Sequence, residues 1–519
     1  LPPTIRGLLS ERVDRLPAGE KRALQAAAVI GPRVPAALLA QVTGMEAELV
    51  RVVTDQLQTA GFLEPATGPG GVLAFRHELM REAVYADLLL RTRREIHGRV
   101  VDAMQASIGD SPGQPVEEIA EHALHAARWS EAARYASLAA QNALARDAHV
   151  EAAYFLRSAI ASVEHWPHGT ERTALALSLH LAIRDPLFRL GRIDELAAHL
   201  TQAALLIDDD TDCRKRGLFY VQSSHVSSLR GDSDAALAEC AKALALAQLH
   251  GDAALAARAR FQQGLELFNR WELVPAVAAL DAAWQYISIH PTDMSYGLEH
   301  GFDVATLSYA TRARAELGDF AEAGSAVTLL LELSEARNRA FESFFACMAI
   351  GHLHEARDQP RAAAEWLDKA EASCRAGDMP LLAMVAATHL GRVMVQSGDI
   401  RDGLVKLQAT HSQINTMGFR GQLAFCLASL AEGYLLNGDL IAAHSAAEQA
   451  IAAARIQNDA GAQVQAALVL AECLHLHRGG EPEREPRLLA EALATAERLS
   501  LRPLAERCRL RLARLSAPA

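Results

Sequence analysis

One short turn recurs along most of the chain at a nearly constant spacing. It reads RLGRID at Gly191, LRGDSD at Gly231, ELGDFA at Gly318, QSGDIR at Gly398 and NGDLIA at Gly438, and related turns stand at Arg270, Arg357 and Gly479. Neighbouring turns are 39 to 41 residues apart, apart from one interval of 48. A fixed period of this size is typical of stacked repeats, which add units to an array instead of enlarging one core.

The residues of the turn predict a helix–turn–helix unit. Gly adopts the left-handed conformation that ends one helix, and the Asp after it caps the next. At Arg357, where Gly is missing, Pro360 suits the first position of the following helix. Abundant Ala lets the paired helices approach closely. We therefore expect an all-α, tetratricopeptide-like superhelical solenoid over residues 115–500, with an inserted loop near Pro291 and a cap helix and tail over residues 501–519.

Residues 1–108 follow another pattern. Short helical segments, among them Glu20–Ile30 and Pro35–Val42, precede two apolar runs that flank a Gly/Pro-rich turn at Gly68–Gly71. That combination is a β-hairpin signal. A long helix from His77 to Gln105 closes the segment. Short helices followed by a hairpin are the outline of a winged-helix module, so the predicted class is mainly α.

Composition excludes several kinds of function. The formal net charge of the chain is −12, and residues 1–105 hold a net of only +1, so we expect no nucleic-acid binding. Seven scattered cysteines without CxxC spacing indicate reduced thiols in a cytoplasmic protein. We see no signal peptide and no apolar run that would span a membrane. Because the first residue is Leu1, we expect the chain to be part of a longer protein.

Catalytic and metal motifs are missing from the sequence. It contains no GxxxxGK[ST], no GxGxxG after a strand and no GxSxG. His122 and His125 share a helix face near Glu121, but no third ligand accompanies them, and His352 and His354 diverge on a helix. The acidic run Asp208–Asp212 favours a solvated loop. We therefore expect no metal site, and no enzyme activity in this chain.

The triplet Arg76-His77-Glu78 is the one candidate site. It stands where the hairpin passes into a helix, in FRHELMREAVYADLL. One interpretation is structural: Glu78 favours the positive helix N-terminus, while Leu79, Ala83, Val84 and Leu88 face the core. The other is that the ionisable side chains contact a ligand.

The first 140 residues resemble a known family. LPPTIRGLLSERVDRLPAGEKRALQAAAVIG, then LAFRHELMREAVYADLLLRTRREIHGRVVDAM and EHALHAARWSEAARYASLAAQNALA, are similar to the region after the ATPase core in bacterial signal transduction ATPases with numerous domains (STAND). The likeness is greatest to AAA-like ATPases fused to adenylate or guanylate cyclases that carry a tetratricopeptide tail. It extends through the repeats, where its motifs are generic.

The resemblance implies a role for the triplet. In STAND ATPases a Met-His-Asp-like motif at the end of the winged helix senses the nucleotide phosphates. Here Arg76 stands for Met and Glu78 for Asp, and His77 is identical. The resemblance thus implies contact with an upstream ATPase domain, where ATP or ADP would bind, and no cofactor within this chain.

These patterns give one function and two competitors. The first is a non-catalytic regulatory arm of a signalling ATPase that binds a protein or small effector in the concave groove of its repeats, within a parent that is a cyclase. The second is an ATPase–tetratricopeptide transcription regulator of the LuxR type. The third is a free-standing tetratricopeptide scaffold, which leaves residues 1–108 without a role.

Overall fold

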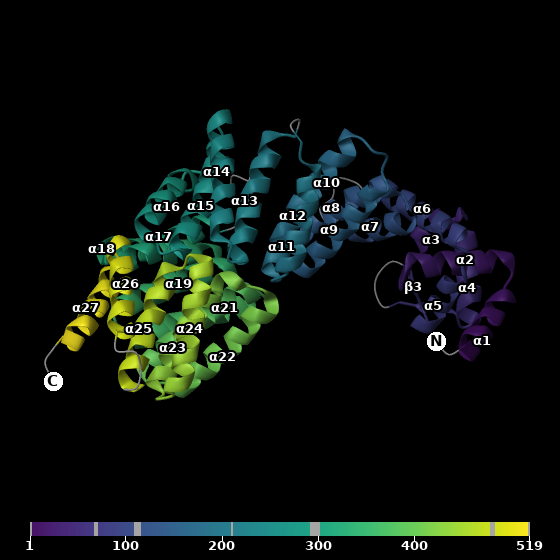
Figure 1. The fold of residues 1–519 in the computed structure, drawn as a ribbon. Coiled ribbons are helices and arrows are strands. Elements are labelled where there is room, and N and C mark those ends of the chain that lie inside the picture. The colour runs from purple at the N-terminus through teal and green to yellow at the C-terminus, as the bar shows by residue number, and fades with distance from the viewer. Residues whose placement is uncertain are drawn as a thin grey trace. The chain divides into compact units, whose positions relative to one another are not determined.

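The computed structural model of the chain describes residues 3–66, 71–107, 116–208, 211–290, 301–477 and 483–516. Its contacts divide the chain into two compact units, Leu1–Leu179 (unit 1) and His180–Ala519 (unit 2). Most described residues are helical, and a small sheet occurs in unit 1 (Figure 1). The predicted mainly α class is confirmed. Among the described residues, no helix has the length and apolar character needed to cross a bilayer.

Unit 1 begins with short helices and strands and continues with helices alone. Its elements are α1 (Pro3–Asp14), α2 (Ala18–Ile30), β1 (Arg33–Pro35), α3 (Ala36–Thr43), α4 (Ala47–Thr59), β2 (Leu63–Pro65), β3 (Val72–Phe75), α5 (Glu78–Asp87), α6 (Leu90–Ala106), α7 (Val116–His125), α8 (Trp129–Ala145), α9 (His149–Glu164) and the start of α10 (Thr170–Ala182).

The sheet of unit 1 has three short antiparallel strands in the order β1-β3-β2. Strands β2 and β3 are the two predicted apolar runs, paired with Leu63 opposite Phe75. Strand β1, with Arg33 opposite Ala74, was not predicted, because three residues are too few to show an alternating pattern. Most of the predicted turn at Gly68 lies outside the described residues.

The predicted single helix from His77 to Gln105 is wrong. The chain forms two helices, α5 and α6, and Leu88 and Leu89 between them are extended, with ψ of 132° and 142°. Leu88 is buried, so the break turns an apolar side chain into the core. Arg93 then donates from Nη2 to the carbonyl of Tyr85 at 2.9 Å and satisfies the end of α5. Without Gly or Pro, the break has no local signal.

Unit 2 is an array of helical hairpins in which each helix packs on the next (Figure 1). The helices are α11 (Arg184–Arg189), α12 (Ile193–Leu206), α13 (Cys213–Leu229), α14 (Ser233–His250), α15 (Ala253–Asn269), α16 (Leu273–Ile287), α17 (Phe302–Leu317), α18 (Phe320–Arg337), α19 (Ala340–Ala356), α20 (Pro360–Ala376), α21 (Pro380–Ser397), α22 (Ile400–Met417), η2 (Arg420–Gln422), α23 (Leu423–Leu436), α24 (Leu440–Gln457), α25 (Ala460–His477), α26 (Arg484–Arg498) and α27 (Arg502–Ser516). The predicted tetratricopeptide-like solenoid is confirmed.

The Gly and Asp residues of the turns adopt their predicted roles, with exceptions. Each turn Gly among the described residues has positive φ, for example 79° at Gly231, and Pro360 begins α20. The Asp cap accepts a backbone hydrogen bond at Asp232, whereas Asp319 makes no side-chain cap bond. Where Gly is absent, Trp271 takes the left-handed conformation instead, with φ of 61°. The segment around Pro291 and the turn at Gly479 lie outside the described residues.

Unit 2 winds back onto itself. Arg189, at the end of α11, donates to Met379 Sδ at 3.5 Å across 190 residues of sequence. Its guanidinium carbon also lies 3.8 Å from the centroid of the Phe341 ring. Trp271, in the turn before α16, lies directly against Gly461 at the start of α25. These long-range contacts enclose the inner side of the array.

Candidate functional site

A cavity of about 120 Å³ lies inside unit 2. Its walls come from the first helices of successive hairpins, namely α11, α13, α15, α17, α19, α21 and α23, and from η2. Phe188, Leu229, Leu381, Phe419 and Phe425 are among its apolar lining residues. Because one water needs roughly 10–15 Å³ of such space, the cavity has room for on the order of ten water-sized groups.

Helical spacing brings charged side chains to the same wall. On α17, Tyr309, Arg312 and Glu316 are three and four residues apart, so they share one face of the helix. On α21, Val385 and His389 share a face for the same reason. All five residues line the cavity, and the inward faces of these helices are therefore both apolar and ionisable.

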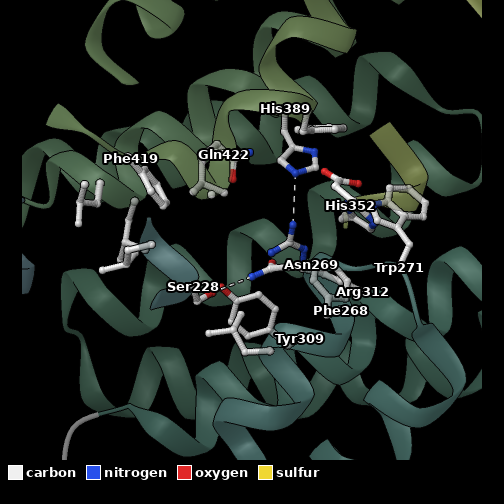
Figure 2. Close-up of a pocket in the computed structure, with 18 of the residues that line it drawn as sticks. Ser228, Phe268, Asn269, Trp271, Tyr309, Arg312, His352, His389, Phe419 and Gln422 are labelled. Atoms are coloured by element: carbon white, nitrogen blue, oxygen red, sulfur yellow. Dashed lines mark hydrogen bonds between the residues drawn. The ribbon is translucent and has the colours of Figure 1, made fainter. Parts of the chain in front are cut away.

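Arg312 is the central polar residue of the wall. Its side chain lies between His389 on one side and the rings of Phe268 and Tyr309 on the other (Figure 2). The guanidinium carbon is 4.9 Å from the Phe268 ring centroid and 5.4 Å from that of Tyr309. Nη2 approaches His389 Nε2 at 3.2 Å. Within the described part of the chain, Nε has no hydrogen-bond partner, and burial lowers the pKa of the group.

A buried chain of polar groups fixes this orientation. Arg392 donates from Nη1 to Glu355 Oε1 at 2.8 Å, and His389 Nδ1 lies 3.2 Å from Glu355 Oε2. Burial opposes the charge on Glu355, but Arg392 and His389 hold its pKa well below the usual range. Burial lowers the pKa of His389 to about 4. A neutral His389 that donates from Nδ1 to Glu355 leaves Nε2 as an acceptor, so Nε2 accepts a hydrogen bond from Arg312 Nη2.

Three of these residues have the spacing of metal ligands. One ligand atom each from His352, Glu355 and His389 lies within 4.8 Å of the others. However, Arg392 and His389 already bond the two oxygens of Glu355, and Arg312 bonds Nε2 of His389. A divalent cation would lie beside two guanidinium groups. The donor set therefore fits a metal poorly.

Asp459 adds an acidic group to the lining of the cavity. It precedes α25, and its Oδ1 accepts from the backbone N–H of Ala462 at 2.8 Å. Burial raises its pKa to about 7. Its carboxyl is consequently in part protonated near neutral pH, which limits the negative charge at the cavity.

The predicted triplet Arg76-His77-Glu78 belongs to unit 1, whereas the cavity belongs to unit 2. All three side chains are exposed at the start of α5, and Glu78 accepts from Arg81 Nε at 2.7 Å. Leu79 is 51% exposed, so its predicted place in the core is wrong, and Met80 is buried there instead. The predicted contact of His77 with nucleotide stays a prediction.

A histidine cluster forms where the sequence showed only a pair. His97 of α6 joins His122 and His125 of α7, with 2.8 Å between the Nδ1 atoms of His97 and His122 and stacked rings of His97 and His125. Spacing could not identify His97 as the third histidine, since it lies 25 residues before His122.

The acidic run Asp208–Asp212 contains a helix cap, because the backbone N–H of Arg214 donates to Asp212 at 3.2 Å. Residues 209 and 210 of the run lie outside the described part of the chain.

The cavity residues were missed, although the repeat period contains a signal for them. The side chain six residues before each left-handed turn residue occupies an equivalent position in each hairpin. From α11 to α23 these equivalent residues are Asp185, His225, Leu265, Arg312, His352, Arg392 and Glu432. We call this set of equivalent positions the repeat column. An ionisable residue occupies each of these positions except Leu265. Aligning the repeats on their turns would have indicated an ionisable stripe on the first helices.

Comparison with known proteins gives distant likenesses. No family model matches the chain. An uncharacterized protein of Rhizobium meliloti is 30% identical over 155 residues, which cover 30% of this chain and 15% of that protein. The chain thus spans a small part of that relative's length.

Two solved structures illustrate the likeness in fold. A Rap protein complexed with competence and sporulation factor is similar over 66% of this chain and 97% of its own, with 14% identity and a TM-score of 0.45. A STAND protein with a tetratricopeptide repeat sensor from Pyrococcus horikoshii is similar over 98% of this chain and 62% of its own, with 14% identity and a TM-score of 0.36.

Proposed function

We propose that the chain is the regulatory arm of a bacterial STAND-type signalling ATPase and that the cavity of unit 2 is its effector site. The observation that carries this proposal is the closed inner face of the repeats, where a buried hydrogen-bond network orients Arg312 toward an otherwise partly apolar space. Enclosed sites with a few oriented polar groups are typical of small-ligand recognition.

The first part of unit 1 would serve as the contact with the ATPase. Its order of elements, with α2, α3 and α4 followed by the β2–β3 pair, supports a winged-helix module. His77 lies exposed at the end of that module, where it can reach a nucleotide bound to another domain. ATP or ADP would bind in the parent's ATPase domain, and a cyclase would be the output.

The mechanism would be a shift between two states of the parent. An effector in unit 2 changes the equilibrium only if it binds one state more tightly than the other. A docked protein in the groove of the repeats would act by the same rule.

The test uses the full-length parent, with its coding sequence read upstream of Leu1. We expect an ATPase domain there, and we expect removal of residues 180–519 to change nucleotide hydrolysis and to abolish its response to effector. Arg361→Ala, on the exposed surface of α20, is a control that should leave both unchanged. Absence of an upstream ATPase, or hydrolysis that is indifferent to the deletion, would contradict the proposal and favour a free-standing scaffold.

A further inference from the structure

We propose that the cavity in unit 2 binds a singly charged organic carboxylate with a compact apolar body, whose carboxylate group is held by Arg312. The inference rests on the proposed function in taking the cavity as the effector site, and it adds the chemical class of the effector.

Arg312 is a buried cation that no carboxylate of the described residues bonds. The side chain is 4% exposed, and no carboxylate oxygen of the described residues forms an ion pair with it. Glu355 and Glu316 are close enough to favour its charge, but neither bonds it: Glu355 bonds Arg392, and Glu316 Oε1 faces His352 Nε2 at 2.8 Å without hydrogen-bond geometry. A buried ion without a counter-ion is costly, and a guanidinium with a free N–H suits a carboxylate. The structure therefore leaves one anion position open.

The charges that line the cavity favour a ligand with one negative charge over a ligand with two. Glu316 and Asp459 also line the cavity, and a phosphate dianion would meet their negative potential with only Arg312 to balance it. One guanidinium balances one carboxylate. Burial raises the pKa of Asp459 to about 7, so this carboxyl is in part protonated at neutral pH and opposes a single negative charge less than a double one.

Apolar side chains form much of the remaining wall of the cavity. Phe188, Leu381, Val385 and Phe419 present apolar surface to the same space. Space for on the order of ten non-hydrogen atoms suits phenylacetate or octanoate. The same carboxylate chemistry also occurs at the C-terminus of a peptide.

Arg258 shows that burial alone does not make a ligand site. Its guanidinium is also buried, stacks 4.1 Å from the Phe302 ring centroid and leaves Nε and Nη1 without partners in the described residues. It does not line the cavity. The two arginines thus differ in access to the space, and Arg258→Met is a matched control for Arg312→Met.

The experiment is isothermal titration of the chain, residues 1–519, with phenylacetate and octanoate and with their neutral amides, which have the same number of heavy atoms. Acetyl-alanine, which is of the same size class, and its C-terminal amide form the peptide arm, and inorganic phosphate and Zn²⁺ are the competing classes. Arginine Nε–H NMR signals, assigned with Arg312→Lys, report contact directly if Arg312→Met fails to fold.

We expect a carboxylate probe to bind at least ~10-fold more tightly than its amide, because a charge-assisted hydrogen bond is lost in the amide. Arg312→Met should weaken binding by a similar factor, Arg258→Met should not, and the Arg312 Nε–H signal should shift. A stronger peptide arm would identify a peptide C-terminus as the source, and a stronger small-molecule arm a free acid.

Equal binding of acid and amide, binding unaffected by Arg312→Met, or no binding by any carboxylate would overturn the inference. So would phosphate binding tighter than the acids, or Zn²⁺ binding that His352→Ala abolishes. Each of these results leaves the deletion experiment on the parent's ATPase unaffected, so the two proposals fail separately.

Discussion

The contact between α6 and α7 should weaken as the pH falls. His97 is 3% exposed and His122 is 9% exposed, and their Nδ1 atoms are 2.8 Å apart. A hydrogen bond at that distance requires one Nδ1 to be unprotonated. Tyr85 Oη lies 3.0 Å from His97 Nε2. If His97 donates from Nδ1, its Nε2 accepts a hydrogen bond from the Tyr85 hydroxyl. Protonation of both imidazoles would place two N–H groups against each other.

The magnitude follows from the pKa values. Burial, with added repulsion from His122, His125 and Arg93, lowers the pKa of His97 to about 3, and burial and His125 lower that of His122 to about 4. Both folded values lie below the unfolded value of about 6.5. The native contact is thus fully stable above about pH 6.5 and loses stability as the pH falls toward the folded values. The slope approaches about 1.4 kcal/mol per pH unit for each histidine, or about 3–4 kcal/mol for both between pH 7 and pH 5.

Hydrogen exchange of the amides in α6 and α7, corrected for intrinsic rates, measures the free energy of local opening. We expect that free energy to fall steeply between pH 7 and pH 5 in the wild-type chain. The double substitution His97→Gln and His122→Gln should flatten the pH dependence, and His168→Gln, at an exposed loop position, should leave it unchanged. An opening free energy independent of pH in the wild type would refute this reasoning.

Three further perturbations test other parts of the structure. Gly461→Ala places a Cβ against the ring of Trp271. It should lower the free energy of unfolding of unit 2 by about 1–3 kcal/mol, measured by denaturant titration. Gly98→Ala is the control, because its Cβ meets open space and should not destabilise α6. Burial raises the pKa of the thiols of Cys240, Cys347, Cys374, Cys426, Cys473 and Cys508. A thiol reagent should therefore label Cys213 first. Equal labelling rates at all seven cysteines, measured by mass spectrometry, would contradict this. His77→Ala in the full-length parent should alter nucleotide-dependent output, and unchanged ADP affinity together with unchanged output would exclude a sensing role.

The local structure of the repeats was predictable because each hairpin is ended by its own turn. Gly231 and Gly398 need a left-handed backbone that glycine adopts without strain, so the turn is visible in the sequence. At Trp271 and Asp358 the same backbone conformation is imposed on other residues, and only the period reveals it. The Leu88–Leu89 break was not predictable, because burial of Leu88 in a core assembled from other helices sets it.

The site was not predictable in the same way. Its residues come from hairpins 40 residues apart, and contacts across 190 residues, such as Arg189 with Met379, enclose it. Those contacts depend on the small rotation between successive hairpins, which accumulates along the array. No single turn or helix specifies that rotation. The sequence can therefore indicate which side chains face inward, but not that the inner face closes.

The unpaired state of Arg312 follows from its place in the repeat column. Arg392 is matched by Glu432 in the next hairpin, with Nε 3.2 Å from Oε2. By contrast, the hairpin after Arg312 has His352 at the equivalent position and the hairpin before it has Leu265, so neither neighbour supplies a carboxylate there. Leu265→Glu should supply the missing carboxylate from within the chain. We expect it to pair with Arg312 and to weaken phenylacetate binding at least ~10-fold, while Leu265→Gln, of similar size and no charge, should weaken it less. Undiminished phenylacetate binding in Leu265→Glu would show that the column does not determine the charge of the cavity.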